Sequence, residues 1–141
     1  IMRQTMISTC LPLLLLGYQG NAQPDKESIT AVIELYFDGW ASSDTGKIGK
    51  AMHSSCQLKY FRDGNFGVVP RHEYLSRFKA PHARDNEVQT SILFLDITGN
   101  IAQAKAKIET PSALFIDYFN LIKTNEGWYI VDKVSTRTDK K

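Results

Sequence analysis

From residue 87 onward the chain consists of β-type segments joined by very short connections, and this feature limits the fold more than any other. Strands are predicted at 87–97, 101–110, 113–124 and 127–136. Gly99-Asn100 and Asn125-Glu126-Gly127 mark two tight turns, and a weaker turn signal lies around Pro111-Ser112. Connections this short join antiparallel neighbours, because a parallel pair needs a long crossover. The sequence therefore predicts an antiparallel meander.

The preceding part of the chain is predicted to be mainly helical. Helices are expected at 28–41, 45–53 and 71–79, where apolar residues recur three and four positions apart. Ser28 is the expected cap of the first helix, Asp44 or Thr45 begins the second, and Pro70 precedes the third.

A short hairpin is predicted between the second and third helices. Residues 56–62 alternate like a strand, Asp63-Gly64 is a strong turn signal, and 66–69 can return as the partner strand. Helices followed by a long antiparallel sheet indicate the α+β class. The expected fold is three N-terminal helices packed in a curved antiparallel sheet, with a cone-shaped cavity between the first helix and the sheet.

The amino-terminal residues have the pattern of a secretory signal peptide. Arg3 precedes the apolar run Met6–Leu16, and small residues lead to an expected cleavage after Ala22. The run is short for a bilayer span, and a buried or amphipathic helix is the alternative. Cleavage would leave a flexible lead-in at 23–27 before one domain over 28–141. The expected location is periplasmic or secreted, with no membrane association after cleavage.

Composition argues against several classes of function. With 141 residues and a net charge of +2, the chain suits one globular domain, and it has no basic stripe for nucleic acid. The histidines lack the spacing of metal ligands, and no glycine-rich phosphate loop is present, so neither metal nor cofactor is predicted. The basic residues Arg71, Arg77 and 79–84 are interpreted as solvated surface.

Asp117 lies in LFIDYFNL, in the middle of an otherwise apolar strand. A buried carboxylate costs several kcal/mol unless it is paired, hydrogen-bonded or protonated. One interpretation is that Asp117 faces the cavity near Tyr36 and binds a polar atom of a ligand. The other is a structural carboxylate, capped by backbone or paired with Lys105 or Lys107 on the adjacent strand. That strand also carries Ala102, Ala104 and Ala106 on one face, which leaves room for a close helix or a ligand.

The order of elements resembles the nuclear transport factor 2-like superfamily, of cystatin-like fold, which includes ketosteroid isomerase and many polyketide cyclases. Three segments look like the putative lumazine-binding family of small bacterial proteins. They are YFDGWASSDTGKIGKAMH (36–53), LKYFRDG (58–64) and FIDYFNLIKTNEGWYIVDKV (115–134). The resemblance covers about 28–136 and implies a small-molecule ligand such as a flat, pteridine-like heterocycle. It also implies a homodimer formed through the open face of the sheet.

Ketosteroid isomerase pairs a helix tyrosine with a protonated strand aspartic acid to stabilise an enolate, an example the field uses for a neutral buried carboxyl group. By resemblance, Tyr36 and Asp117 occupy these two positions. The position of its catalytic base is Tyr60, which is not a carboxylate, and Asp63 lies three residues further toward the turn. The resemblance therefore does not extend to steroid-type isomerisation.

Other candidate residues each have two interpretations. Trp40 shares a helix face with Tyr36, so it can stack on a heterocycle or pack in the core. His53 and Cys56 can form a nucleophile pair, or be a histidine at a helix end and a small buried thiol. Trp128 follows a turn and is expected to anchor a hairpin.

Three functions remain open at this point. The first is an exported small-molecule-binding protein with a site at Tyr36, Trp40, His53, Tyr60 and Asp117. The second is an isomerase, dehydratase or cyclase-type enzyme that uses Tyr36 and Asp117 as hydrogen-bond donors, with His53 or Tyr60 as base. The third is a non-catalytic dimerisation module. The missing carboxylate base favours the first.

Overall fold

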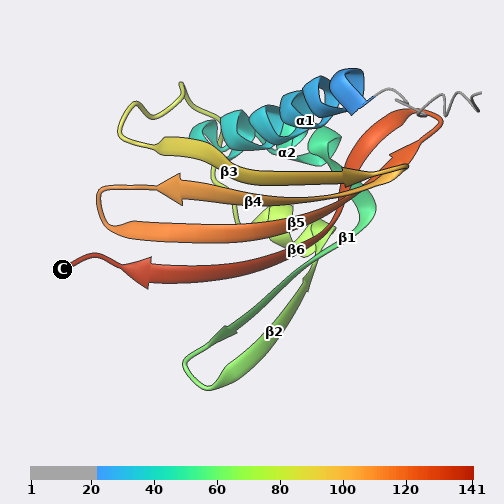
Figure 1. The fold of residues 1–141 in the computed structure, drawn as a ribbon. Helices are drawn as coiled ribbons and strands as arrows, with labels where there is room; N and C mark the ends of the chain where they lie inside the picture. Colours follow the sequence, from blue (N-terminus) through green and yellow to red (C-terminus); the bar gives the residue numbers. More distant parts are fainter. Residues whose placement is uncertain (1–21) are drawn as a thin grey trace, which may run out of the picture.

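The computed structural model describes residues 22–141. Its elements are α1 (Ala22–Ser42), α2 (Thr45–Ala51), β1 (Met52–Arg62), β2 (Asn65–Pro70), α3 (Arg71–Ser76), β3 (Gln89–Thr98), β4 (Ile101–Glu109), β5 (Ala113–Thr124) and β6 (Gly127–Asp139) (Figure 1). One sheet has the order β2-β1-β6-β5-β4-β3. Strands β3 to β6 pair antiparallel, which confirms the meander, and β1 joins it parallel to β6. The α+β class is confirmed.

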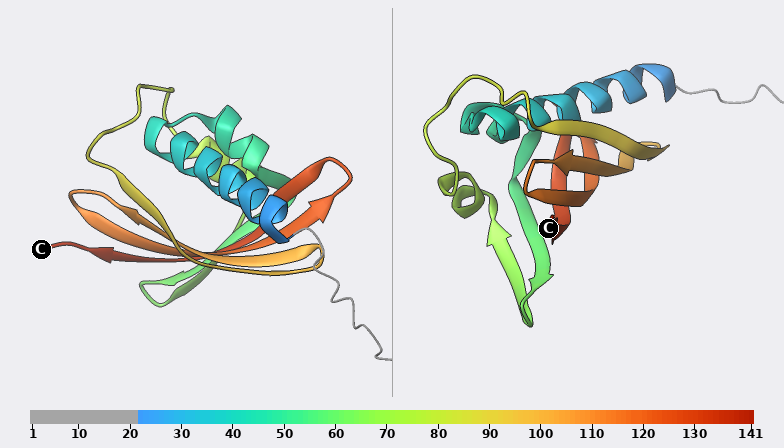
Figure 2. Two further views of the ribbon diagram at one scale, coloured as in Figure 1. Left: turned by 45° about the horizontal axis from the view of Figure 1, so that its top comes forward. Right: turned by 90° about the vertical axis from the view of Figure 1, so that its left-hand side faces the viewer.

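Helix α1 lies across the concave face of the sheet, while the β1–β2 hairpin projects away from it (Figures 1 and 2). Ile33 and Phe37 of α1 belong to the same buried core as Ala104 and Ala106 of β4, and all four have no exposed surface. Small side chains let a helix approach a sheet closely. The space beside these two alanines is therefore closed to solvent.

Helix α1 begins at Ala22, before the expected Ser28 cap, so residues 23–27 are helical rather than a flexible lead-in. The Ser28 hydroxyl donates to the carbonyl oxygen of Pro24 at 2.9 Å, a bond typical of serine inside a helix. The expected signal peptide falls almost wholly on residues 1–21, which lie outside the described residues. Within 22–141, no helix combines the length and apolar character that a bilayer span requires.

The short helix α2 ends earlier than expected. Of the two expected caps, Asp44 is the one used: it accepts a hydrogen bond from the Lys47 backbone N–H at 3.1 Å. Because β1 starts at Met52, His53 lies on a strand, and its interpretation as a histidine at a helix end was wrong. The Asp63-Gly64 turn is confirmed, with φ of 51° and 77°.

Candidate ligand-binding site

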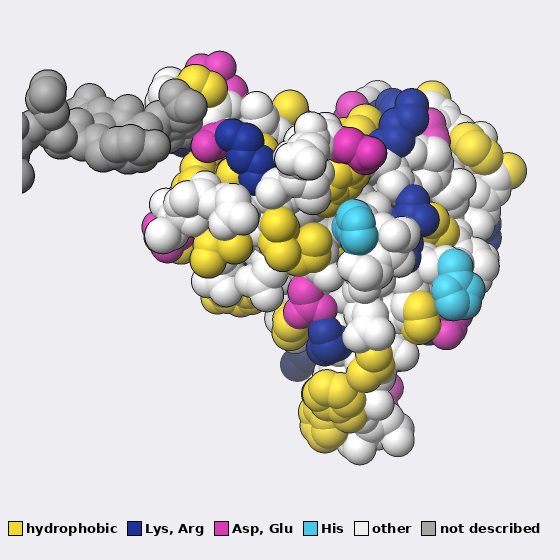
Figure 3. All heavy atoms as spheres, turned by 90° about the vertical axis from the view of Figure 1, so that its right-hand side faces the viewer, with side chains coloured by type: hydrophobic (Ala, Val, Ile, Leu, Met, Phe, Trp, Pro, Cys, Tyr) yellow, Lys and Arg dark blue, Asp and Glu magenta, His cyan; other side chains and the backbone are white. Residues whose placement is uncertain are grey.

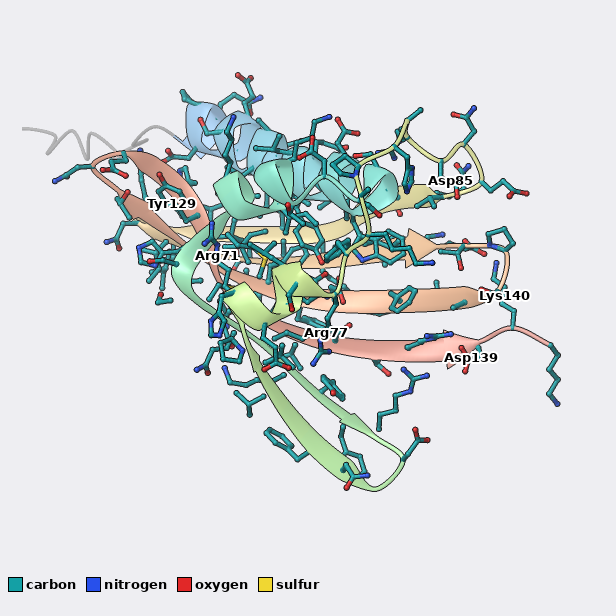
Figure 4. All side chains as sticks on the ribbon, turned by 180° about the vertical axis from the view of Figure 1, so that it is seen from behind. Arg71, Arg77, Asp85, Tyr129, Asp139 and Lys140 are labelled. Carbon is teal, nitrogen blue, oxygen red and sulfur yellow. The ribbon has the colours of Figure 1, made fainter. Side chains whose placement is uncertain are left out.

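Two cavities adjoin the inner face of β6. The large cavity borders α1, α3 and the segment 77–88, and the arginine cavity borders β1 and β5. The large cavity, about 560 Å³, is lined by Trp40, Ala41, Ser43, Tyr74, Arg77, Phe78, His82, Asp85, Val88, Thr110 and Arg137. The arginine cavity, about 240 Å³, is lined by Leu58, Tyr60, Phe61, Arg62, Arg77, Phe115, Ser135 and Arg137. Both cavities border Arg77 and Arg137. Figure 4 shows Arg77 at the end of α3, on the side that faces β6.

Asp117 is compensated inside the core by two residues of β6. Its Oδ1 accepts a hydrogen bond from the Ser135 hydroxyl at 2.6 Å, and its Oδ2 lies 3.0 Å from Lys133 Nζ. Asp117 is 1% exposed and Lys133 is 4% exposed. Such burial is tolerated because the charges neutralise each other. The expected partners Lys105 and Lys107 were wrong, since they lie on the face of β4 opposite the core.

A β-bulge in β6 turns Lys133 inward. Leu121 of β5 pairs with Ile130, but the preceding Asn120 pairs with Asp132, so Val131 is an extra residue on β6. One extra residue reverses which side chains face the core beyond that point. Trp128 and Ile130 are buried before the bulge, and Lys133 is buried after it. The inner face then continues through Ser135 and Arg137 toward the cavities.

Tyr36 and Tyr74 form a second buried polar contact, beside the ion pair of Asp117 and Lys133. Their hydroxyl oxygens are 2.7 Å apart, and the Lys133 ammonium lies 5.8 Å and 5.4 Å from the two ring centroids. Burial raises the pKa of Tyr36 well above its usual value, and Tyr74 and Asp117 add to the effect. Burial alone would lower the pKa of Lys133, but Tyr74 and Asp117 outweigh it and the pKa is raised. Lys133 is therefore charged and Tyr36 neutral at physiological pH.

A family model described as "Putative lumazine-binding" matches residues 24–135. The chain belongs to this family. No curated protein matches it.

Several solved structures share the fold of this chain. An NTF2-like protein of unknown function from Shewanella baltica has a TM-score of 0.76 at 21% identity, covering 83% of this chain and 96% of that one. A second, from Methylobacillus flagellatus, has a TM-score of 0.74 at 24% identity, covering 83% and 94%. A ketosteroid isomerase-like protein from Erwinia carotovora has a TM-score of 0.65 at 13% identity, covering 84% and 99%. The NTF2-like fold is therefore confirmed.

The structure separates the five predicted site residues into four places. Trp40 lines the large cavity, and its ring meets Phe115 edge-on at 5.4 Å. Tyr60 lines the arginine cavity. Tyr36 and Asp117 are buried in the core and line neither cavity. They reach the cavity walls only through their partners Tyr74 and Ser135.

His53 lies apart from both cavities. Its Nδ1 is 2.7 Å from the Ser55 hydroxyl oxygen, and its ring meets Tyr129 edge-on at 5.8 Å. Burial, with Asp132, raises the pKa of the Cys56 thiol to about 12. Cys56 is therefore a protonated core residue at neutral pH, and no thiolate–imidazole pair forms. Among residues 22–141, no three His, Cys, Asp or Glu side chains are grouped as metal ligands.

Sequence reasoning missed the arginines of the site. Arg71 and Arg77 were interpreted as solvated surface. Arg77 is exposed as predicted but also lines both cavities, whereas Arg71 donates to the Gly49 carbonyl oxygen at 2.6 Å. Arg137 lies one residue beyond the predicted end of the last strand. The alternate positions Lys133, Ser135 and Arg137 share one face of β6, which is the only sequence signal for this site. That face can be assigned to the inside of the sheet only once the bulge at Val131 is known.

Proposed function

We propose that this protein binds a small, flat molecule in the cleft formed by the large cavity and the arginine cavity. The observation that carries the proposal is the wall of the cleft, where the rings of Trp40, Tyr60 and Phe115 stand beside a few polar groups. Concave sites that combine aromatic walls with a few placed polar groups are typical of small-molecule sites. The family description supports a lumazine-like heterocycle as ligand.

Binding is favoured over isomerase-type catalysis by the positions of the two expected donors. That chemistry needs a hydroxyl and a carboxylic acid that point at the reacting oxygen of the substrate. Here the Tyr36 hydroxyl contacts Tyr74, and Asp117 contacts Ser135 and Lys133. Both groups already contact other protein side chains in the core, so they support residues that line the cleft rather than contact a ligand atom.

Lumazine binding measured by thermal shift and calorimetry tests the proposal. A ligand that binds only the native state increases the free energy of unfolding, by about 2.7 kcal/mol when its concentration is about a hundred times Kd. The melting temperature rises as a result. We expect the shift with lumazine to be lost in Trp40→Ala and Tyr60→Ala. Phe66→Ala is the matched control, because Phe66 is 69% exposed and lines neither cavity. An unchanged affinity in both cavity variants would contradict the proposal.

We also propose that the protein is exported and that a second copy covers the outer face of the sheet. The signal-peptide pattern supports export, and cell fractionation with mass measurement of the mature chain tests it. An apolar row supports the dimer: Phe94, Tyr118 and Val134 are 56%, 43% and 47% exposed. Strand register places them in one row across the sheet, in the order Phe94, Lys105, Tyr118 and Val134. Exposed apolar patches commonly mark association surfaces.

A further inference from the structure

We propose that the arginine cavity holds an anionic group, a carboxylate or a phosphate, on the flat ligand. This inference rests on the proposed function and names the ligand class of the same cleft. Three of the residues that line the cavity are Arg62, Arg77 and Arg137, and none of its lining residues within 22–141 is acidic. The three come from different elements, the end of β1, the residue after α3, and β6. Guanidinium groups that converge on one small space favour an anion there.

Each of the three arginines has a carboxylate neighbour outside the cavity lining, and each guanidinium has further N–H groups beyond that contact. Arg77 Nη2 donates to Glu73 Oε1 at 2.8 Å. Asp139 receives Arg137 Nε at 2.7 Å, and it lies 4.0 Å from Arg62. Arg62 is also 3.8 Å from Asp63, which is too long for a hydrogen bond. Within residues 22–141, the terminal nitrogens of Arg137 have no hydrogen-bond partner. These donors can therefore form the paired bonds that a carboxylate or phosphate accepts.

The cavity is held in shape before any ligand arrives. The Arg137 guanidinium lies 5.5 Å from the ring centroid of Phe115, its direct neighbour across β5 and β6. Such stacking fixes the plane of the guanidinium. The Tyr60 ring lies against Gly67, where a Cβ would come within 2.4 Å of Tyr60 Cζ. Glu73 raises the pKa of Arg77, so this charge persists at every physiological pH.

The residues that line the arginine cavity also indicate which kind of molecule bears the anionic group. The rings of Tyr60, Phe61 and Phe115 border the cavity together with the arginines. Aromatic walls favour a flat ring, and guanidinium groups favour an acidic substituent on its edge. Arg77 and Arg137 also line the large cavity, whose wall includes the Trp40 ring, so a longer ring system would meet a second aromatic group there. The expected ligand is therefore an aromatic or heteroaromatic acid.

Calorimetry with matched probes tests this inference. The probes are 2-naphthoate, 2-naphthyl phosphate and the neutral 2-naphthamide, with lumazine as a ring that lacks the acid. We expect the better of the two anions to bind at least about tenfold tighter than the amide, with the advantage shrinking as salt rises. Whichever anion binds tighter identifies the preferred group.

Arginine variants separate the cavity from general surface charge. In Arg137→Met, and separately in Arg62→Met, the preference for the anion over the amide should fall several-fold while the amide still binds. Arg84→Met is the control, because Arg84 pairs with Asp38 outside the cavity. If wild-type protein binds lumazine and the amide as well as the anions, the anion inference is wrong and the proposed function stands. If neither anion, amide nor lumazine binds, both are overturned.

Discussion

At the residue scale, the most demanding feature of the core is the ion pair of Asp117 and Lys133. Both side chains are almost fully buried, and their 3.0 Å separation lets each neutralise the other. Removing one partner leaves a buried charge alone, which typically costs about 3–5 kcal/mol, whereas replacing both by apolar residues is often close to neutral. Because the pKa of Lys133 is raised from 10.5, its contribution is fully present below that pH and is lost only as pH rises through the higher folded value.

A double-mutant cycle tests this account of Asp117. We expect Asp117→Leu and Lys133→Met each to lower the free energy of unfolding by about 3–5 kcal/mol, and the double variant to lose much less than the sum. Ser135→Ala is the milder comparison, with a loss of about 1 kcal/mol for one hydrogen bond. Urea denaturation at neutral pH gives these values. Additive losses in the double variant would show that the two charges do not depend on each other.

At the element scale, strands and turns that follow from a regular pattern of apolar residues could be predicted from the sequence. Contacts that depend on a break in that pattern could not. The meander, the α+β class and the Asp63-Gly64 turn followed from strand alternation and turn chemistry. The partner of Asp117 did not, because simple alternation from Trp128 places Lys133 on the outer face. An extra residue in a strand has no distinctive composition, so Val131 gave no signal. The arginine cavity could not be predicted for a second reason: its lining residues come from segments that are distant in sequence.

The bulge itself can be tested by removing its extra residue. Deleting Val131 would restore uninterrupted pairing and turn Lys133 and Ser135 toward the outer face, leaving Asp117 buried without either partner. We expect a large loss of stability or failure to fold. Val131→Ala keeps the bulge and should cost far less, because this side chain is only half-buried. Thermal unfolding and the amide exchange of β5 and β6 compare the two variants, and equal stabilities would contradict the role given to the bulge.

At the scale of the whole molecule, the two faces of the curved sheet have different surroundings. Its concave face holds α1, the ion pair and the cleft, whereas its convex face presents Phe94, Tyr118 and Val134 to solvent. A second exposed apolar group lies at the tip of the β1–β2 hairpin, where Phe61 and Phe66 pair across the strands (Figure 3). The convex row is the better candidate for a self-complementary contact. It crosses the four neighbouring strands β3 to β6, while the hairpin tip extends away from the rest of the sheet.

Sedimentation velocity tests the convex face as the dimer contact. Val134→Lys introduces a charge close to Lys59, its neighbour in the strand register, so two copies meeting at this face would repel. We expect the dimer dissociation constant to rise at least about tenfold. Phe66→Lys places the same charge on the hairpin tip and should leave association unchanged. If Phe66→Lys dissociates the dimer and Val134→Lys does not, the hairpin is the contact. A wild-type protein that stays monomeric at high micromolar concentration would rule out both surfaces as stable self-association sites.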